Sequence, residues 1–231
     1  MPCMCKKVVV FDLDDTLYKE IDFLKSGYRQ VAELVEKRYA LSENEIYHNL
    51  LSWYYKKENP FVLLNETYGL DSPVADYLDV YRFHHPNICL SDGVEETLSE
   101  LKTRDVVLGI ITDGRKVTQQ NKIEALGLSR WFEKENIFIN EEPGHFKPSH
   151  WSFDRLMQHC LEQFPSQDLS FYYVGDNPQK DFLAPNEFGW ETICLLDDGR
   201  NIHQQEFGNI DGYLPKYKVN TFSDLSNVVS T

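Results

Sequence analysis

Four segments of the chain are continuously apolar instead of alternating between apolar and polar positions. They span residues 8–11, 106–111, 171–174 and 192–196. Continuous apolar runs of this length are typical of parallel strands that are buried on both faces of a sheet. Residues 137–139 form a weaker fifth run. The pattern therefore predicts a buried parallel sheet.

Segments with helical periodicity lie between these runs. They span residues 94–102, 117–126 and 151–164. Asp92 is the expected N-cap of the first, and Gly127 ends the second. Strands that alternate with helices predict right-handed crossovers and a doubly wound, Rossmann-like α/β fold. We expect residues 205–220 to form a surface connection before a last helix near residues 223–229.

Residues 18–88 interrupt this alternation, because they contain helical stripes and no buried strand. One stripe consists of Leu24, Tyr28, Val31, Val35 and Tyr39. Ser42 and Glu45 have the spacing of a capping box, and Ser72 and Pro73 suit the N-cap and first position of a further helix. We therefore expect an all-helical domain at 18–88, inserted into an α/β core domain made of residues 1–17 and 89–231.

Polar residues gather where the predicted strands end. They are Asp12, Asp14, Asp15 and Thr16 after the first strand, Thr112, Asp113 and Gly114 after the second, Lys147 after the weaker run, and Asp176 and Asp181 after the next. In an open α/β sheet, ligands bind at the carboxyl ends of the strands. The topology therefore predicts that these segments converge on one crevice.

The residue types in that crevice indicate a cation and an anion site. Neighbouring carboxylates repel each other by about 4 kcal/mol per pair at about 4 Å and an effective dielectric of about 20. Oxygen ligands from Asp12, Asp176 and a main-chain carbonyl favour a hard cation, of which Mg²⁺ is the usual one. Thr112, with the N–H groups of Asp113 and Gly114, suits an anion, and Lys147 adds a positive charge.

Composition narrows the choice of partners. Lys and Arg number 23 against 37 Asp and Glu, and the net charge of -14 disfavours nucleic acid. The sequence contains no apolar run of membrane-spanning length and no secretory leader pattern, so we expect no membrane partner and a cytoplasmic protein. Cys3 and Cys5 lack a second pair that would complete a metal site, so the five cysteines are interpreted as free thiols.

Four motifs together resemble those of the haloacid dehalogenase-like (HAD) superfamily. FDLDDTLY at 11–18 resembles the first motif, IITDG at 110–114 the second, FKP at 146–148 the third, and YVGDNPQKD at 173–181 the fourth. They occur in the family's order and each follows an apolar run. The helical insert after the first motif resembles the family's C1-type cap domain.

The resemblance implies a role for each matching residue. Asp12 would be the nucleophile that forms an aspartyl-phosphate, and Asp14 the general acid and then the general base. Thr112 would bind a phosphoryl oxygen, together with the N–H groups already noted, and Lys147 would neutralise nucleophile and phosphate. Family dehalogenases lack an acid at the position of Asp14, so the resemblance favours the phosphatase branch.

The resemblance also implies the metal ligands. Mg²⁺ would be held by Asp12, the main-chain carbonyl of Asp14 and Asp176, and Asp181 would tune that site from outside the ligand set. Asp15 has no role in the motif and is interpreted as a local structural acceptor.

We therefore predict a Mg²⁺-dependent phosphomonoester hydrolase that acts on a small phosphorylated metabolite, such as a nucleotide or sugar phosphate. Two alternatives stay open: phosphoryl transfer to a second acceptor, as in phosphomutases, and a receiver-like signalling or binding protein. The sequence leaves the physiological substrate, the cap residues that contact it and the oligomeric state open. Arg115 is interpreted as covering a helix terminus, and His84 and His85 as hinge or surface residues instead of metal ligands.

Overall fold

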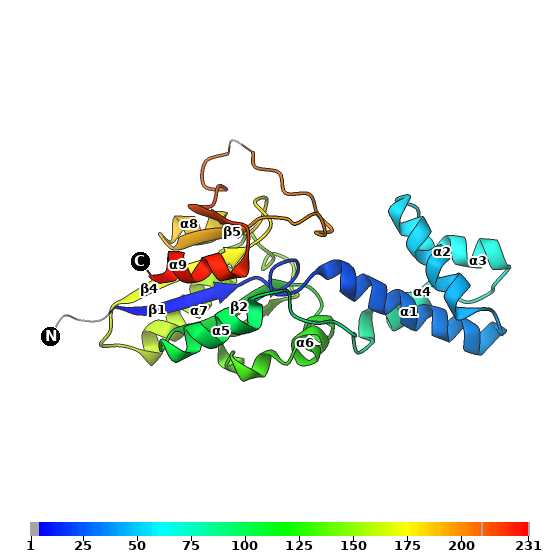
Figure 1. Cartoon of the computed structure of the whole chain (residues 1–231), viewed down its shortest axis with the longest axis horizontal. Helices are drawn as coiled ribbons and strands as arrows, with labels where there is room; N and C mark the ends of the chain where they lie inside the picture. Colours follow the sequence, from blue (N-terminus) through cyan, green and yellow to red (C-terminus); the bar gives the residue numbers. More distant parts are fainter. Residues whose placement is uncertain (1–4, 209, 231) are drawn as a thin grey trace. The chain divides into compact units, whose positions relative to one another are not determined.

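The structure is a computed structural model that describes residues 5–208 and 210–230. The chain divides into two compact units (Figure 1). One contains the chain up to Glu20 and from Cys89 onward, and the other is Ile21–Ile88. We propose that the second unit is the helical insert expected at 18–88. Among the described residues, no helix combines the length and apolar character that a membrane span requires.

A six-stranded sheet with the order β3-β2-β1-β4-β5-β6 forms the centre of the first unit, and every pairing is parallel. The strands are β1 (Lys6–Phe11), β2 (Val107–Asp113), β3 (Ile137–Asn140), β4 (Leu169–Gly175), β5 (Glu191–Leu195) and β6 (Tyr217–Val219). The predicted α/β fold and its five strands, including the weaker run, are confirmed. The prediction that 205–220 is only a surface connection is wrong, because β6 lies within it. Two of its three residues are exposed, so no buried apolar run reveals this edge strand.

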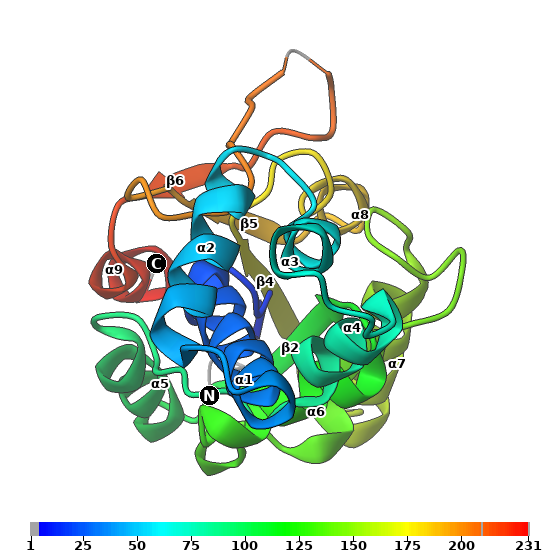
Figure 2. The same ribbon diagram turned by 90° about the vertical axis from the view of Figure 1, so that its right-hand side faces the viewer.

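Helices cover both faces of this sheet. They are α5 (Val94–Thr103), α6 (Lys116–Ala125), α7 (Trp151–Gln163), α8 (Leu183–Glu187) and α9 (Leu225–Ser230). Figures 1 and 2 show α5 and α9 on one face and α7 and α8 on the other. On the second face, Phe153 and Leu156 of α7 pack with Val8, Val10 and Tyr173 of the sheet, all fully buried.

The predicted helices α5, α6, α7 and α9 are confirmed, whereas α8 is too short to show a periodic stripe. The predicted N-cap of α5 is wrong. Gly93 takes that position with φ 78°, and no side chain caps the helix. The Val94 N–H donates instead to the Ser91 carbonyl at 3.2 Å. A main-chain turn therefore satisfies an N–H group at the start of the helix, the role expected of the Asp92 side chain.

The described elements of the second unit are all helices. Its elements are α1 (Glu20–Tyr39, which begins in the first unit), α2 (Glu43–Tyr55), α3 (Pro60–Tyr68) and α4 (Val74–Phe83). Aromatic rings form much of its core: the Phe61 ring lies 5.9 Å from the rings of both Tyr28 and Tyr77.

Two helix starts in this unit refine the sequence predictions. The Ser42 hydroxyl caps α2 by accepting from the Glu45 N–H at 3.4 Å, as expected. Ser72 does not cap α4, because Pro73 is the N-cap and the Ser72 hydroxyl bonds the Tyr39 hydroxyl at 2.7 Å. Helix α3 was not predicted, although Asn59 caps it with a side-chain oxygen.

Substituting Gly109, in the middle of β2, tests the packing between the sheet and α7. A Cβ at this position would lie 2.9 Å from Leu156 Cδ1 and 3.2 Å from the Asn136 carbonyl oxygen. We expect Gly109→Ala to lower the free energy of unfolding by about 1–3 kcal/mol through overpacking. Urea denaturation measures it. Leu156→Ala alone should cost about 2–5 kcal/mol. The double variant should lose less than the sum, and strictly additive losses would contradict the predicted contact.

Candidate active site

Segments from three adjacent strands bring the predicted site residues together at the carboxyl edge of the sheet. Asp12 follows β1, Thr112 lies near the end of β2, and Asp176 follows β4. Strand β1 pairs with both β2 and β4, which makes these strand ends neighbours. All three side chains are buried. The convergence expected from the topology is therefore present in the structure.

Lys147 is the cation at the centre of this site. Its Nζ lies 2.7 Å from Asp12 Oδ1 and 2.7 Å from Asp181 Oδ1, and it donates to the Tyr173 hydroxyl at 3.0 Å. Burial alone would lower the pKa of Lys147, but the charges of Asp12 and Asp181 outweigh it and hold that pKa well above its ordinary value. The two carboxylates therefore favour the charged ammonium form of Lys147.

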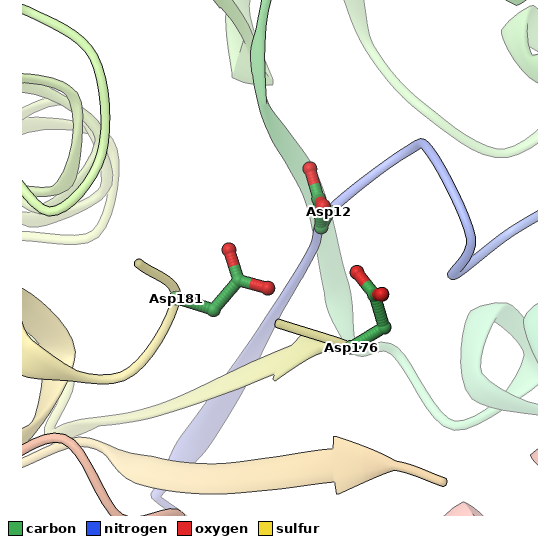
Figure 3. A group of neighbouring side chains, drawn as sticks. All are labelled: Asp12, Asp176 and Asp181. Carbon is green, nitrogen blue, oxygen red and sulfur yellow. The ribbon is translucent and has the colours of Figure 1, made fainter. Parts of the chain in front are cut away.

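Three carboxylates surround one small space (Figure 3). Asp12, Asp176 and Asp181 each place an oxygen within 4.8 Å of the others. Asp181, expected outside the metal ligands, thus belongs to the group as closely as the other two. The Asp14 side chain is not part of it, and the ligand expected from Asp14 was its main-chain carbonyl. No other group of this kind occurs among the residues that the structure describes.

The charge balance of this group fits a divalent cation. Asp12 Oδ2 is buried and finds no hydrogen-bond partner among the described residues. Burial, together with the charge of Asp181, raises the pKa of Asp12 from 3.8 to about 6 against the opposing charge of Lys147. Burial and the charges of Asp181 and Asp12 hold the pKa of Asp176 well above its ordinary value. Such a set of oxygen atoms matches the donors that Mg²⁺ prefers.

Asp14 is held by a second, separate set of donors that sequence reasoning missed. Its Oδ1 accepts from Lys122 Nζ at 2.6 Å and from the Tyr18 hydroxyl, and its Oδ2 accepts from Gln119 Nε2 at 2.8 Å. Burial alone would raise the pKa of Asp14, but the Lys122 charge and these hydrogen bonds outweigh it and lower that pKa. A signal was present: Gln119 and Lys122 are polar residues three positions apart on a helix that packs against the sheet.

The anion site differs in part from the prediction. Thr112 is fully buried, and its Oγ1 accepts from Gln119 Nε2 at 2.7 Å. The Gly114 N–H, which was expected to bind phosphate, donates to the Asn140 carbonyl at 2.9 Å. It is therefore engaged within the protein, because β3 ends beside it. The Asp113 carboxylate accepts from Asn140 Nδ2 at 2.8 Å and from the Lys147 N–H at 3.2 Å, which fixes the segment that carries Lys147.

The loop after β5 contributes a further segment that the sequence did not indicate. Asn201 Nδ2 donates to Asp176 Oδ2 at 2.9 Å, and Asn201 Oδ1 accepts from Lys19 Nζ at 2.7 Å. Gln205 Nε2 donates to the Asp176 carbonyl at 2.7 Å. Asp15 binds this loop too, since it accepts from the Ile202 N–H at 3.0 Å. The loop thus orients one of the three clustered carboxylates.

The remaining candidates lie apart from these contacts. Arg115 is exposed at the N-cap of α6. In the second unit, His84 is buried, with its Nε2 3.1 Å from the Ser26 hydroxyl, whereas His85 is exposed. Cys5 is an exposed free thiol, and Cys3 lies outside the described residues.

Comparisons with known proteins find relatives along most of this chain. A sequence profile of the haloacid dehalogenase-like hydrolases matches residues 9–195. The chain is 25% identical over 233 residues to the glyceraldehyde 3-phosphate phosphatase of Methanocaldococcus jannaschii, covering 96% of each chain. It is 32% identical over 123 residues to the pyrimidine 5'-nucleotidase YjjG of Escherichia coli, covering 53% of this chain and 49% of that enzyme.

A solved structure shows the same fold. The HAD-hydrolase YfnB of Bacillus subtilis, whose crystals contained bound magnesium, superposes with a TM-score of 0.63 at 20% sequence identity. The superposition covers 98% of this chain and 100% of that one.

Gly175, directly before Asp176, is predicted to be essential for the carboxylate cluster. A Cβ there would lie 2.6 Å from Asp181 Oδ2 and 2.9 Å from Asp181 Cγ. We expect Gly175→Ala to displace Asp181 from Lys147 and to weaken Mg²⁺ binding about 10- to 100-fold, as loss of a supporting contact commonly does. Calorimetric titration with Mg²⁺ measures it. Gly208→Ala is the control, because its Cβ would contact nothing within 4 Å among the described residues. Equal affinities in the two variants would contradict the prediction.

The raised pKa of Asp12 predicts a pH-dependent response to Mg²⁺. The folded chain keeps a proton on Asp12 up to about pH 6, whereas the unfolded chain releases it near 3.8. Without metal, this carboxyl's contribution to stability is therefore present below the lower value and lost as pH rises through the higher one. We expect Mg²⁺ to raise the melting temperature more at pH 7 than at pH 5, and Asp176→Asn to reduce that difference. Thermal melts in EDTA and in Mg²⁺ measure it, and equal shifts at both pH values would refute it.

Proposed function

The chain belongs to the haloacid dehalogenase-like hydrolase family, and from this premise we propose that it hydrolyses small phosphate monoesters through an aspartyl-phosphate on Asp12. The proposal rests on one arrangement above all. Asp12 Oδ1 is paired with Lys147 at 2.7 Å, whereas Asp12 Oδ2 is buried and lacks a hydrogen-bond partner among the described residues. One oxygen of the carboxylate is thus neutralised and the other is left to react.

The enzyme is a hydrolase of phosphoric monoesters. Curated relatives that align along almost the whole chain are named phosphatases. The acid at position 14 agrees with this assignment, because the dehalogenases of the family lack it. Family membership leaves the receiver-like alternative without support. A cytoplasmic location stays a prediction.

In the first step, Asp12 Oδ2 attacks the phosphorus atom, a P–O bond to Asp12 forms, and the bond to the leaving alcohol breaks. Lys147 and the Thr112 hydroxyl face the negative charge of the phosphoryl oxygens, which is where fixed donors lower the barrier most. Asp14, in its protonated form, gives its proton to the leaving oxygen. Mg²⁺ held by Asp12, Asp176 and the Asp14 carbonyl would supply the positive charge that lets a phosphate approach three carboxylates.

In the second step, Asp14 accepts a proton from water, and the resulting hydroxide attacks the phosphorus atom of the aspartyl-phosphate. The bond to Asp12 breaks, and inorganic phosphate leaves. One carboxyl group therefore alternates between acid and base, which returns the enzyme to its starting state. Asp181 keeps Lys147 in place through its own contact at 2.7 Å.

We propose a small phosphorylated metabolite as the substrate, either a sugar phosphate or a nucleotide. The full-length similarity to glyceraldehyde 3-phosphate phosphatases supports the first class, and the partial similarity to a pyrimidine 5'-nucleotidase supports the second. Phosphoryl transfer to a second acceptor is the outcome that the same panel would reveal, because it consumes the ester without releasing phosphate.

Phosphate release from a panel of monoesters tests this function. The panel contains glyceraldehyde 3-phosphate, hexose phosphates, pyrimidine nucleoside monophosphates and para-nitrophenyl phosphate. We expect release in Mg²⁺ and none in EDTA, and Asp12→Asn should lose at least about 10³-fold because the nucleophile is gone.

Asp154→Asn on the exposed side of α7 is the matched control and should retain full activity. No release from any ester by the unaltered chain, while Mg²⁺ still binds, would refute the proposed hydrolysis. Normal turnover by Asp12→Asn would refute the covalent intermediate on that residue.

A further inference from the structure

Gln119 connects the predicted phosphate-binding residue to the predicted general acid. It lies on α6 with only 1% of its surface exposed. Its Nε2 donates to Thr112 Oγ1 at 2.7 Å and to Asp14 Oδ2 at 2.8 Å. One side-chain amide therefore uses both of its N–H bonds on two residues that come from different strand ends. None of the four sequence motifs contains this residue.

Gln119 is the donor in both hydrogen bonds. Asp14 accepts hydrogen bonds from Lys122 Nζ and the Tyr18 hydroxyl on Oδ1, and from the Gln119 amide nitrogen on Oδ2, so before substrate binds it is an acceptor toward all three residues. The same nitrogen then donates its second hydrogen to Thr112 Oγ1. Thr112 is thereby an acceptor toward Gln119, and its own hydroxyl hydrogen points elsewhere. Among the described residues, the side-chain hydrogen bond of Thr112 Oγ1 is the one that it accepts from Gln119.

We propose that Gln119 is a positioning residue that orients the Thr112 hydroxyl as a donor to the transferred phosphoryl group and holds Asp14 Oδ2 beside it. This inference rests on the proposed function, because it assumes that Thr112 faces the phosphoryl group. Gln119 acts through its two partners and does not itself contact the substrate. A donor oriented before the substrate arrives needs no reorganisation during the reaction, which is the condition under which such donors are most effective.

Lys122 does not duplicate this role. It binds the other oxygen of Asp14, Oδ1, at 2.6 Å, and it supplies charge. The Gln119 contact instead depends on position 119 being a hydrogen-bond donor. A glutamate of nearly the same size would present oxygen acceptors to Thr112, so the Thr112 hydroxyl would turn its hydrogen toward position 119. It would also place a second negative charge beside Asp14.

Gln119→Glu is therefore the informative variant, with Gln120→Glu as its matched control. Gln120 is the adjacent residue on the same helix and is exposed, so it receives the same change of charge outside the site. With para-nitrophenyl phosphate and saturating Mg²⁺, we expect Gln119→Glu to lower kcat about 10²-fold, the loss typical of one misdirected donor. We expect KM to change less than threefold, and Gln120→Glu to change neither constant by more than twofold.

A double-mutant cycle with Thr112→Val tests whether the effect passes through the hydroxyl. Once the hydroxyl is absent, there is no hydrogen for position 119 to misdirect. We therefore expect Gln119→Glu to cost less than about tenfold in the Thr112→Val background, against about 10²-fold in the unaltered chain. Para-nitrophenyl phosphate suits this cycle because its leaving group departs without protonation, which minimises the contribution of Asp14 to the first step.

The Asp14 contact has its own readout. Gln119→Leu removes both hydrogen bonds without adding a charge. We expect it to slow an alkyl phosphate, whose leaving oxygen needs a proton, several-fold more than para-nitrophenyl phosphate. An equal loss on both substrates would overturn the part of the inference that concerns Asp14.

The outcomes separate this inference from the proposed function. No phosphate release by the unaltered chain refutes the function itself. Activity in the unaltered chain with a folded, fully active Gln119→Glu overturns the inference alone, as do equal losses in the two backgrounds. Thermal melting and Mg²⁺ titration check folding. If Gln119→Glu does not fold, the cycle is run with Gln119→Leu and Thr112→Val, and strictly additive losses in kcat overturn the inference.

Discussion

The buried ammonium of Lys147 is the interaction on which the site depends. It is enclosed with Asp12 and Asp181 at 2.7 Å each, and its side chain is fully shielded from solvent. Without it, three carboxylates would share a space less than 5 Å across, and burial would force them to take up protons. Lys147 neutralises part of this negative charge. The pKa values of Asp12 and Asp176 are nevertheless raised, which reflects burial and the negative charge that Lys147 does not neutralise. The remaining imbalance supports the proposed binding of a cation and a phosphate ester at this site.

The rest of the first unit positions that ammonium. The Asp113 carboxylate at the end of β2 holds the main chain at Lys147, and Asp181 holds its Nζ. Asp181 can approach because Gly175 has no side chain there. Each contact lies at the carboxyl edge of a parallel sheet. The strands themselves are buried on both faces, so polar side chains are placed where the strands end. The apolar runs thus determine where the charges gather, and the glycine in the fourth motif is required by packing.

The sequence predicts which polar residues gather at the carboxyl edge of the sheet where these residues lie next to strand ends. Asp12, Thr112 and Asp176 follow continuous apolar runs, and parallel topology alone brings such positions together. The contacts of Gln119 and Asn201 were not predicted from the sequence. Gln119 binds Asp14, which is 105 positions away in sequence, and Asn201 binds Asp176, which is 25 positions away. A polar residue on a helix or in a loop is interpreted as solvated when its partner is unknown. Gly114 is the opposite case. From the sequence its N–H is expected to be free to bind phosphate, but in the fold it donates to the Asn140 carbonyl at the end of β3. Strand β6 was missed because an exposed edge strand has no apolar run.

Asp12 and Asp14 lie two positions apart, yet their surroundings shift their pKa values in opposite directions. Burial raises that of Asp12 to about 6, whereas Lys122 and the donors around it lower that of Asp14 against the effect of burial. The proposed first step needs the reverse order, with Asp12 ionised and Asp14 protonated. A divalent cation bound to Asp12 lowers the pKa of Asp12, since it favours the charged form. A phosphate dianion beside Asp14 raises the pKa of Asp14 by like-charge repulsion. Binding of cation and ester together would therefore shift both pKa values toward the protonation states that the proposed first step needs.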